Sequence, residues 1–558
     1  MKKNIGVLGA AVLAVWLVSG CQRTSDVVDL VLINGTVWTG ERGAPRAEAV
    51  ALRAAKIAAV GSSRDIRRLA GGAARVIDLR GGLVLPGFID SHTHFLDGGF
   101  SLLSLRLRDA MSREDFISRL GRRAAELPKG EWILNGDWDH QQFDPPELPR
   151  RDWIDAVTPE NPVCVNRHDG HMVLANTLAL RIAGITAQTP SPDGGEIMKD
   201  PATGEPTGIL KDAAIGLVSR HIPAPTLAAK VRAAEAALRE AAANGVTSLH
   251  DMAGSSNFEV YQELLRAGKL TVRIALYVPI DDPDAFERLR LKKPIGNDRL
   301  KIGGLKAFVD GSLGSGTALF FEPYADNPRS AGLLHEQMFP DGVMEQRILA
   351  ADRAGLQVAV HAIGDRANAI TLDIFEKAVR ANGPRDRRWR IEHAQHLRPT
   401  DIPRFGRSGV IASVQPFHAA DDGRWAQSKI GRGRCLTTYA FRSLIDGGAV
   451  LALGSDWTVA PLNPLTGIAG AVTRRTTDGK NPGGWFPEQK LTLEEALAGY
   501  TRNGAYAEFA ESSKGTIAPG KLADLVVLDR DIFKVPPENI ADARVTLTIL
   551  DGAVIYEQ

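Results

Sequence analysis

The sequence predicts an α/β fold: a (β/α)8 TIM barrel with a small β-sandwich built from both chain ends and an inserted subdomain after the first barrel strand. Three observations predict this fold. Strand-like segments lie at both ends of the chain, eight short apolar runs that end in polar residues lie between them, and one connection is much longer than a βα unit. Strand-like runs that alternate with helical segments indicate βα units, and eight such units close into a barrel.

The two chain ends contain the strands expected in the sandwich. Residues 29–40 predict a hairpin, because an apolar run, an Asn-Gly turn and an alternating run follow one another. Further alternating or apolar runs extend to about residue 79, and others lie at residues 515–528 and 545–556. We therefore expect residues 21–82 and 510–558 to form one composite β-sandwich, with residues 83–509 as the barrel.

The eight apolar runs define the expected barrel strands. The gap between the first two runs is too long for a structureless loop in a compact domain, so we expect an insertion at about residues 96–240. The runs are residues 83–94, 246–251, 272–278, 302–310, 356–361, 389–393, 410–415 and 450–456.

Composition excludes several classes of protein. Hydrophobic residues make up 44% of the 558 residues and charged residues 24%, which is ordinary for a globular chain and excludes disorder. The 67 Lys and Arg against 66 Asp and Glu give a net charge of +1 without a basic stripe, so no nucleic-acid partner is expected. Three cysteines cannot form a disulfide framework.

Residues 1–20 have the pattern of an export signal. Lys2 and Lys3 precede an uncharged apolar stretch over residues 5–20, shorter than the roughly 20 residues of a membrane span. The following Leu-Val-Ser-Gly-Cys segment resembles the lipobox of bacterial lipoproteins, which implies cleavage before Cys21 and lipidation of its thiol. Gln22 is not the aspartate of an inner-membrane retention signal, so we expect an exported protein anchored by lipid to the outer membrane, on its periplasmic or surface side. The alternative is an uncleaved signal anchor.

A group of residues with metal-ligand chemistry ends the first run. Asp90, His92 and His94 stand at i, i+2 and i+4, and alternate residues of a strand share one face. Two histidines in this arrangement can bind one metal ion, although structural histidines produce the same pattern.

Three further residues strengthen the metal interpretation. His361, His393 and Asp456 lie at the ends of the fifth, sixth and eighth runs, far apart in the sequence. Catalytic residues of a (β/α)8 barrel collect at the carboxyl ends of its strands, so we expect these residues to meet His92 and His94 there.

Lys306 is expected to point into the barrel. It lies in the fourth run among alternating apolar residues, and an unpaired ammonium in the interior would be costly. One interpretation is a salt bridge to Asp310 or another interior carboxylate. The other is carbamylation by CO2, which converts the amine into an anionic oxygen ligand that bridges two metal ions.

These motifs resemble those of the amidohydrolase superfamily, specifically the YtcJ-like subfamily that includes N-substituted formamide deformylases. The resemblance extends from about residue 29 to the C-terminus. It is carried by PGFIDSHTHF (86–95), GVTSLHD (245–251), LKAFVDGSLGSGTA (305–318), HAIGDRAN (361–368), RIEHAQ (390–395), SVQP (413–416), LALGSDW (451–457) and PGKLADLVVLD (519–529).

The resemblance implies a ligand set and a reaction. His92 and His94 would hold one divalent metal, zinc being favoured; His361 and His393 would hold a second, and carbamylated Lys306 would bridge them. Asp456 would bind the metal and the reacting water, acting first as general base and then as general acid. A metal-activated hydroxide would then cleave a C–N bond in an amide, with N-substituted formamides as one substrate class.

Candidate substrate-binding residues lie in the insertion and after the fourth run. They are Trp138, His171 and Asp310. One departure from the subfamily pattern is visible, because the segment after Pro206-Thr207-Gly208 has Asp212 where a glutamate is common.

Two alternative functions remain open on the sequence. A lactone, carbamate or cyclic-imide hydrolase would use the same metal centre, and a non-catalytic surface-binding lipoprotein would use the barrel without chemistry. Intact residues at all six ligand positions argue against the second. The expected partners are a small-molecule substrate and the membrane, and the oligomeric state stays open, with a homodimer as one alternative.

The lipobox generates a first prediction. Replacing Cys21 with alanine removes the thiol that carries the lipid, so we expect Cys21→Ala to remain uncleaved after Gly20 and to take up no acyl label. Fractionation with an acyl-chain label measures both. Wild-type protein that leaves membranes in high salt without detergent, and that carries no label, would show the lipoprotein interpretation to be wrong.

Overall fold

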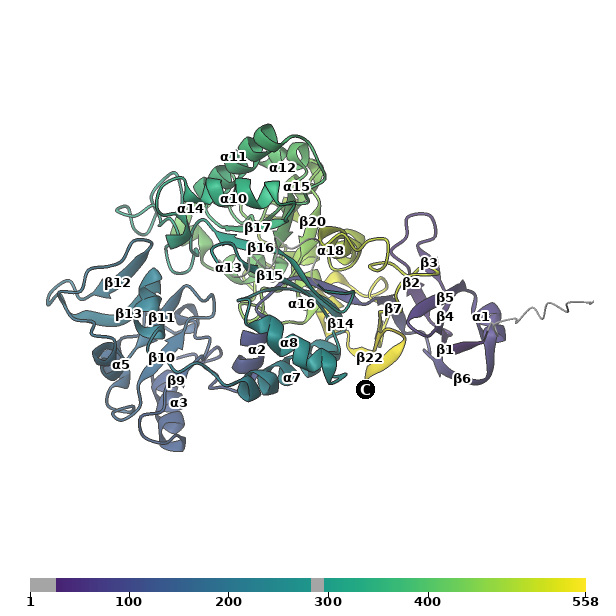
Figure 1. The fold of residues 1–558 in the computed structure, drawn as a ribbon, viewed down its shortest axis with the longest axis horizontal. Helices are drawn as coiled ribbons and strands as arrows, with labels where there is room; N and C mark the ends of the chain where they lie inside the picture. The colour runs from purple at the N-terminus through teal and green to yellow at the C-terminus, as the bar shows by residue number, and fades with distance from the viewer. Residues whose placement is uncertain (1–26, 283–295) are drawn as a thin grey trace, which may run out of the picture.

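The structure is a computed structural model that describes residues 27–282 and 296–558. Three regions follow one another across Figure 1: the inserted subdomain, the barrel and the β-sandwich. The expected export signal and Cys21 lie outside the described residues. Within the described part of the chain, every helix is too short or too polar to cross a membrane.

Eight parallel strands form the barrel in the predicted order. Each predicted run overlaps one barrel strand, and a parallel bridge joins Thr93 of the first strand to Trp457, just after the last. The predicted (β/α)8 class is therefore confirmed. The strands are β8 (Phe88–Thr93), β14 (Val246–Met252), β15 (Arg273–Pro279), β16 (Leu300–Phe308), β17 (Val358–Ala362), β18 (Arg390–His393), β19 (Ile411–Val414) and β20 (Leu451–Leu453).

Helices cover the outside of the barrel. Two of them, α2 (Phe95–Leu102) and α7 (Leu227–Ala243), contact each other through small residues, since a Cβ on Gly99 would lie 2.1 Å from the carbonyl oxygen of Ala233. The Thr226 side chain accepts from the amide of Ala229 and begins α7. Further helices are α8 (Asn257–Arg266), α10 (Val343–Arg353), α11 (Asp365–Asn382), α12 (Ile402–Ser408), α13 (Pro416–Asp422), α14 (Ala426–Cys435), α15 (Phe441–Asp446), α16 (Pro464–Thr473), α17 (Leu493–Gly499) and α18 (Arg502–Ala507).

The first predicted run is two strands rather than one. β7 (Leu83–Pro86) pairs with β21 (Leu525–Leu528) in the sandwich, and β8 begins after Gly87 in the barrel. Glycine fits this junction because a Cβ there would lie 2.2 Å from the Thr247 hydroxyl oxygen. The chain thus passes from sandwich to barrel four residues later than the sequence indicates.

Both ends of the chain build the sandwich, as predicted, but the hairpin expected at residues 29–40 is wrong. Its halves enter different sheets, because the Asn34-Gly35 turn carries the chain from one layer to the other. One sheet has the order β5-β4-β1-β6 and the other β23-β22-β21-β7-β2-β3. Their remaining bounds are β1 (Val28–Ile33), β2 (Thr36–Trp38), β3 (Arg46–Ala47), β4 (Ala49–Arg53), β5 (Lys56–Gly61), β6 (Ala70–Asp78), β22 (Val545–Leu550) and β23 (Ala553–Glu557).

The insertion has its own sheet and its own core. Apolar side chains fill one core between this sheet and helix α3 (Arg113–Glu126), and a second core lies beneath α5 (Thr177–Ile182). The insertion is therefore an ordered subdomain, as its length predicted. Its strands, in sheet order, are β12 (Gly195–Lys199), β13 (Pro206–Asp212), β11 (Met172–Ala175), β10 (Val163–Asn166) and β9 (Ile133–Leu134).

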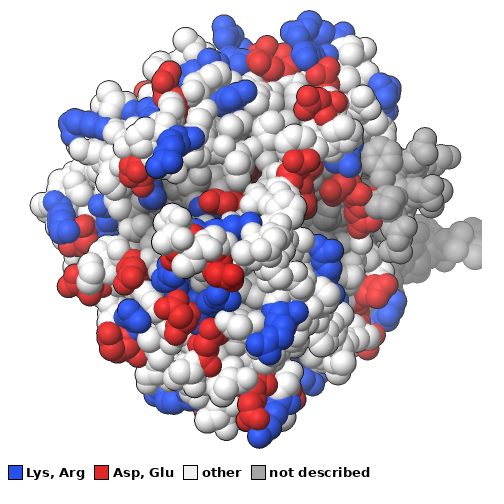
Figure 2. Space-filling model, turned by 90° about the vertical axis from the view of Figure 1, so that its left-hand side faces the viewer, with Lys and Arg blue, Asp and Glu red and all other residues white. Residues whose placement is uncertain are grey.

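Charges of both signs alternate over the surface. On the face shown in Figure 2, lysines and arginines lie among aspartates and glutamates, and neither sign forms a continuous patch. This distribution agrees with the near-zero net charge of the sequence.

A buried ion pair joins the barrel to the sandwich and generates a stability prediction. Arg273 donates to Asp524 at 2.7 and 2.9 Å, with both side chains about 5% exposed or less. Arg273→Leu would leave the Asp524 carboxylate buried without its guanidinium, so we expect the free energy of unfolding to fall by about 3–5 kcal/mol.

Urea denaturation followed by circular dichroism measures this loss. The exposed pair Arg75–Glu557 serves as the matched control, and Arg75→Leu should cost less than about 1 kcal/mol. Equal midpoints for the Arg273 and Arg75 variants would contradict the structural role of the buried pair.

Candidate active site

A cavity of about 590 Å³ lies at the carboxyl ends of the barrel strands, between the barrel and the insertion. Its size is within the usual range of small-molecule pockets. Barrel residues form its floor, and residues 134–137, 164–173 and 212–222 of the insertion contribute to its walls.

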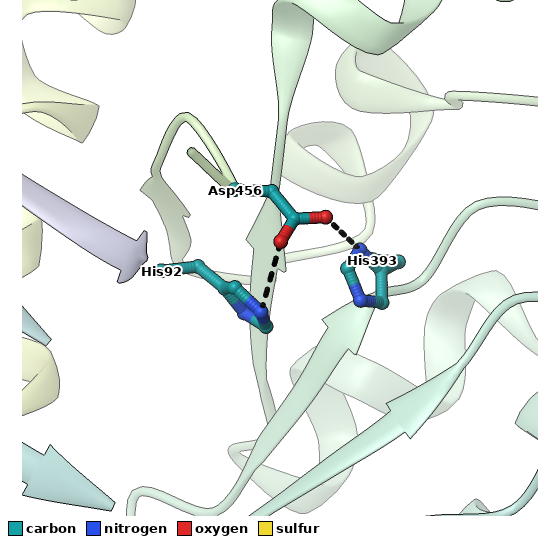
Figure 3. Close-up of side chains that lie close together, drawn as sticks. All are labelled: His92, His393 and Asp456. Atoms are coloured by element: carbon teal, nitrogen blue, oxygen red, sulfur yellow. Dashed lines mark ion pairs between the residues drawn. The ribbon is translucent and has the colours of Figure 1, made fainter. Parts of the chain in front are cut away.

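Three predicted ligands converge on the cavity floor. His92 from β8, His393 from β18 and Asp456 after β20 place their donor atoms within 4.8 Å of one another. Figure 3 shows the Asp456 carboxylate between the two rings, with Oδ1 3.5 Å from His92 Nε2 and Oδ2 3.8 Å from His393 Nδ1. His393 and Asp456 have positive φ angles of 73° and 59°, a strained conformation for residues with a Cβ.

The other predicted histidines border this group. His94 lies just after β8, with Nε2 3.3 Å from Asp456 Oδ1. The ring of His361, at the end of β17, has its centroid 4.6 Å from that of His393, and its Nε2 is 3.1 Å from the carbonyl oxygen of Gly311. The structure thus brings three of the four predicted histidines to Asp456, and His361 lies against His393.

Lys306 points into the barrel, as its position in the strand predicts. It is 3% exposed, lines the cavity, and its Nζ lies 4.4 Å from the centroid of the Phe308 ring. Among the described residues, Nζ has neither a hydrogen-bond partner nor an ion pair, so the expected alternative of a salt bridge to Asp310 is not formed. Burial lowers the pKa of the Lys306 amine to about 8.

The protonation states of His92, His393 and Asp456 suit metal binding. Burial lowers the pKa of His393 to about 3 and that of His92 well below its ordinary value, so both rings are neutral near pH 7. Burial raises the pKa of the Asp456 carboxyl, but the adjacent His92 and His94 outweigh this effect and lower it overall. Neutral imidazoles and an ionised carboxylate are the forms that bind divalent ions.

Two buried nitrogens near the proposed metal donors lack a hydrogen bond to any described residue. His92 Nε2 and Lys306 Nζ are enclosed without a hydrogen bond, although buried polar groups are nearly always paired. Nitrogen and carboxylate donors directed at one point, with partners missing, fit a divalent metal ion.

His171 and Asp212 form a pair on the wall contributed by the insertion. The His171 ring lines the cavity with its centroid 5.2 Å from that of His361, and its Nδ1 is 2.6 Å from Asp212 Oδ1. Burial lowers the pKa of His171, but Asp212 outweighs this effect and raises it. Asp212 adopts φ 46° and ψ −122°, which is strained for a residue other than glycine.

The structure places two of the predicted substrate-binding residues elsewhere. Trp138 is fully buried in the core of the insertion, where its indole donates to the carbonyl oxygen of Val165 at 2.8 Å, and it does not line the cavity. Asp310 lies below the cavity lining and accepts from the backbone amides of Leu319, Ile363 and Gly364. In the structure these two side chains hold protein groups in place and do not line the cavity.

A second group of potential metal donors lies beside the cavity. Donor atoms of Asp139, His168 and Asp421 fall within 4.8 Å of one another. However, Arg167 lies 3.2 Å from Asp139 and Arg424 lies 2.5 Å from Asp421, so guanidinium groups already neutralise both carboxylates. This group therefore lacks the free negative charge that a divalent ion requires.

Sequence reasoning missed residues that surround the predicted ligands. His418 lines the cavity with Nε2 3.9 Å from Asp456 Oδ2, and Glu392 contacts His92 from the opposite side. His418 follows the Ser-Val-Gln-Pro motif and Glu392 lies within Arg-Ile-Glu-His, so their motifs were visible. Their contacts were not, because each depends on which strand lies across the barrel.

Comparisons with known proteins agree with this geometry. The profile described as the Amidohydrolase family matches residues 75–556. Protein LONG AFTER FAR-RED 3 of Arabidopsis thaliana is 40% identical over 543 residues, covering 95% of this chain and 92% of that protein. The putative amidohydrolase YtcJ of Bacillus subtilis is 33% identical over 532 residues, covering 94% and 99%. The N-substituted formamide deformylase of Arthrobacter pascens is 29% identical over 549 residues, covering 95% and 98%.

A solved structure shows the same arrangement over most of the chain. The crystal structure of an uncharacterized metal-dependent hydrolase from Pyrococcus horikoshii superposes with a TM-score of 0.73 at 31% identity. The match covers 91% of this chain and 99% of that protein, so it includes far more than the barrel.

Proposed function

Because the chain belongs to the amidohydrolase family and its fold is that of a metal-dependent hydrolase, we propose that it hydrolyses a C–N bond in a small amide, with N-substituted formamides as the first substrate class. The observation that carries the proposal is the convergence of His92, His393 and Asp456 beside the unpartnered Lys306. The similarity to an N-substituted formamide deformylase over 95% of the chain supports the choice of bond.

Six residues would hold the metal. His92, His94, His361 and His393 would bind one or two divalent ions through their rings, Lys306 through a carbamate and Asp456 through its carboxylate. Zinc suits this set of imidazole and carboxylate donors. When bound, a divalent ion supplies a Lewis acid and lowers the pKa of a bound water.

Asp456 and His171 provide the other functions that hydrolysis of an amide requires. The carboxylate of Asp456 is ionised and lies on the cavity floor, so it can accept a proton from the attacking water and then donate it to the leaving nitrogen. His171 faces the same cavity from the insertion and is held by Asp212, a placement that suits contact with the substrate.

Two alternative functions would use the same cavity. A lactone, carbamate or cyclic-imide hydrolase needs the same floor, because the metal donors do not determine which leaving group is cleaved. A non-catalytic lipoprotein that only binds a ligand is less well supported, since all six proposed ligands are present. Export and lipid attachment through Cys21 remain part of the proposal.

A substrate screen tests the reaction. Metal-loaded protein is assayed against simple amides, N-formyl compounds, carbamates, cyclic imides, esters and lactones. We expect turnover of amides or N-formyl compounds that is lost on chelation and restored by zinc, and that falls at least 1,000-fold in Asp456→Asn. Turnover confined to lactones, carbamates or cyclic imides would favour the alternative hydrolase, and binding without turnover would favour the non-catalytic protein.

Lys306 provides a second test of the metal centre. We expect Lys306→Ala to lose both bound metal and activity, because the bridging oxygens are missing, and acetate or propionate to restore part of each. Lys306→Arg should be less active than Lys306→Ala because it fixes a positive charge among the ligands. Elemental analysis and intact mass measure these outcomes. Full metal content in Lys306→Ala would leave Lys306 without a bridging role.

The reaction of Lys306 with CO2 should depend on pH in the metal-free protein. The neutral amine attacks the carbon of CO2, an N–C bond forms, and a proton is released. Because the pKa of the amine is about 8 rather than its ordinary value, the reactive form increases as the pH rises from 7 to 9. Carbamylation at fixed CO2 should rise over the same interval.

A further inference from the structure

We propose that Glu392 and Arg390 are positioning residues that orient His92 toward the metal and fix the proton on its Nδ1. This inference rests on the proposed role of His92 as a metal ligand. It does not depend on which bond the enzyme cleaves.

The contact between Glu392 and His92 is short and fully enclosed. Oε2 of Glu392 lies 2.5 Å from Nδ1 of His92, and both side chains are 0% exposed. A carboxylate in this position accepts a hydrogen bond from Nδ1–H, so the proton is on Nδ1 and the lone pair is on Nε2. Figure 3 shows the His92 ring directed at Asp456, and Nε2 has no hydrogen-bond partner among the described residues.

Arg390 holds Glu392 from below. The two residues are separated by one position in β18, so both side chains point into the barrel. Arg390 donates to both carboxylate oxygens of Glu392, from Nε at 2.7 Å and from Nη2 at 3.1 Å. The two-point contact with the guanidinium fixes the plane of the carboxylate.

The guanidinium of Arg390 also donates hydrogen bonds to acceptors on four other strands of the barrel. Strands β8, β14, β15 and β19 each supply one acceptor, and the guanidinium is 0% exposed. The acceptors are the carbonyl oxygen of Ser91, His250 Nδ1 at 2.6 Å, the Tyr277 hydroxyl at 3.3 Å and the Ser413 hydroxyl at 2.9 Å. Arg390 therefore cannot rotate without breaking contacts on several strands.

Arg390, Glu392 and their hydrogen-bond partners form a polar layer inside the barrel. This layer occupies space that apolar side chains ordinarily fill. The interior of a (β/α)8 barrel is usually filled by valine, isoleucine and leucine, and a buried ion pair is rarely more stabilising than apolar residues of the same volume. A purely structural role therefore explains the layer poorly. The contact with His92 gives it a function, because a carboxylate behind a ligating histidine fixes the tautomer and raises the basicity of the ligand.

Metal binding to Glu392→Gln tests the inference without measuring catalysis. The variant keeps the shape of the side chain but loses the charge, so we expect the dissociation constant for Zn²⁺ to rise about 10- to 100-fold. The visible absorption of the Co²⁺-loaded protein should change as well, since it reports the geometry around the ion. The matched control is Glu511→Gln, whose carboxylate pairs with Arg388 and is 42% exposed; it should bind both ions like wild type.

If loss of the charge unfolds Glu392→Gln, the variant Glu392→Asp still tests the inference. It retains the negative charge for Arg390 but withdraws the oxygens from His92 by one methylene. We expect a folded protein, judged by circular dichroism, that binds Zn²⁺ more weakly than wild type. Wild-type affinity and Co²⁺ spectrum in a folded Glu392 variant would overturn the positioning role, whereas a wild-type protein that binds no divalent metal would instead refute the proposed function.

Discussion

Closure of eight parallel strands into one ring is the constraint on which the rest of this structure depends. Parallel strands in a closed barrel end on one rim, so residues that follow different strands are brought to the same place. The bridge between Thr93 and Trp457 closes the ring next to His92 and Asp456, which lie at opposite ends of the barrel sequence. Without closure, the Asp456 carboxylate would not meet His92 and His94, which belong to the first strand and the residues after it.

Burial of polar groups and backbone strain at the site are unfavourable, and several parts of the molecule compensate for them. Neutral histidines, an unpaired lysine and a carboxylate lie buried on one floor, and His393 and Asp456 adopt strained backbone conformations there. Local strain of this kind persists only where the surrounding structure enforces it. The surrounding structure here includes the polar layer around Arg390 below the floor and the helices that cover the strands.

The insertion and the barrel have separate tasks in this arrangement. The barrel supplies the proposed metal ligands. The insertion supplies cavity walls, including His171 and its partner Asp212, and has an apolar core of its own around Trp138.

The sequence by itself determined the barrel, its eight strands, the insertion and the residues that meet at the rim, because apolar periodicity and motif position are local signals. Tertiary structure alone decided the contacts across the barrel. Nothing local in the sequence indicates that Glu392 lies behind His92, since that contact depends on strand order, stagger and depth within the barrel. The same reason explains two differences between the structure and the expectations from the sequence. The Asn34-Gly35 turn connects two layers, and Trp138 faces a core instead of a cavity. A strand pattern shows which residues share a face, but only packing decides what that face contacts.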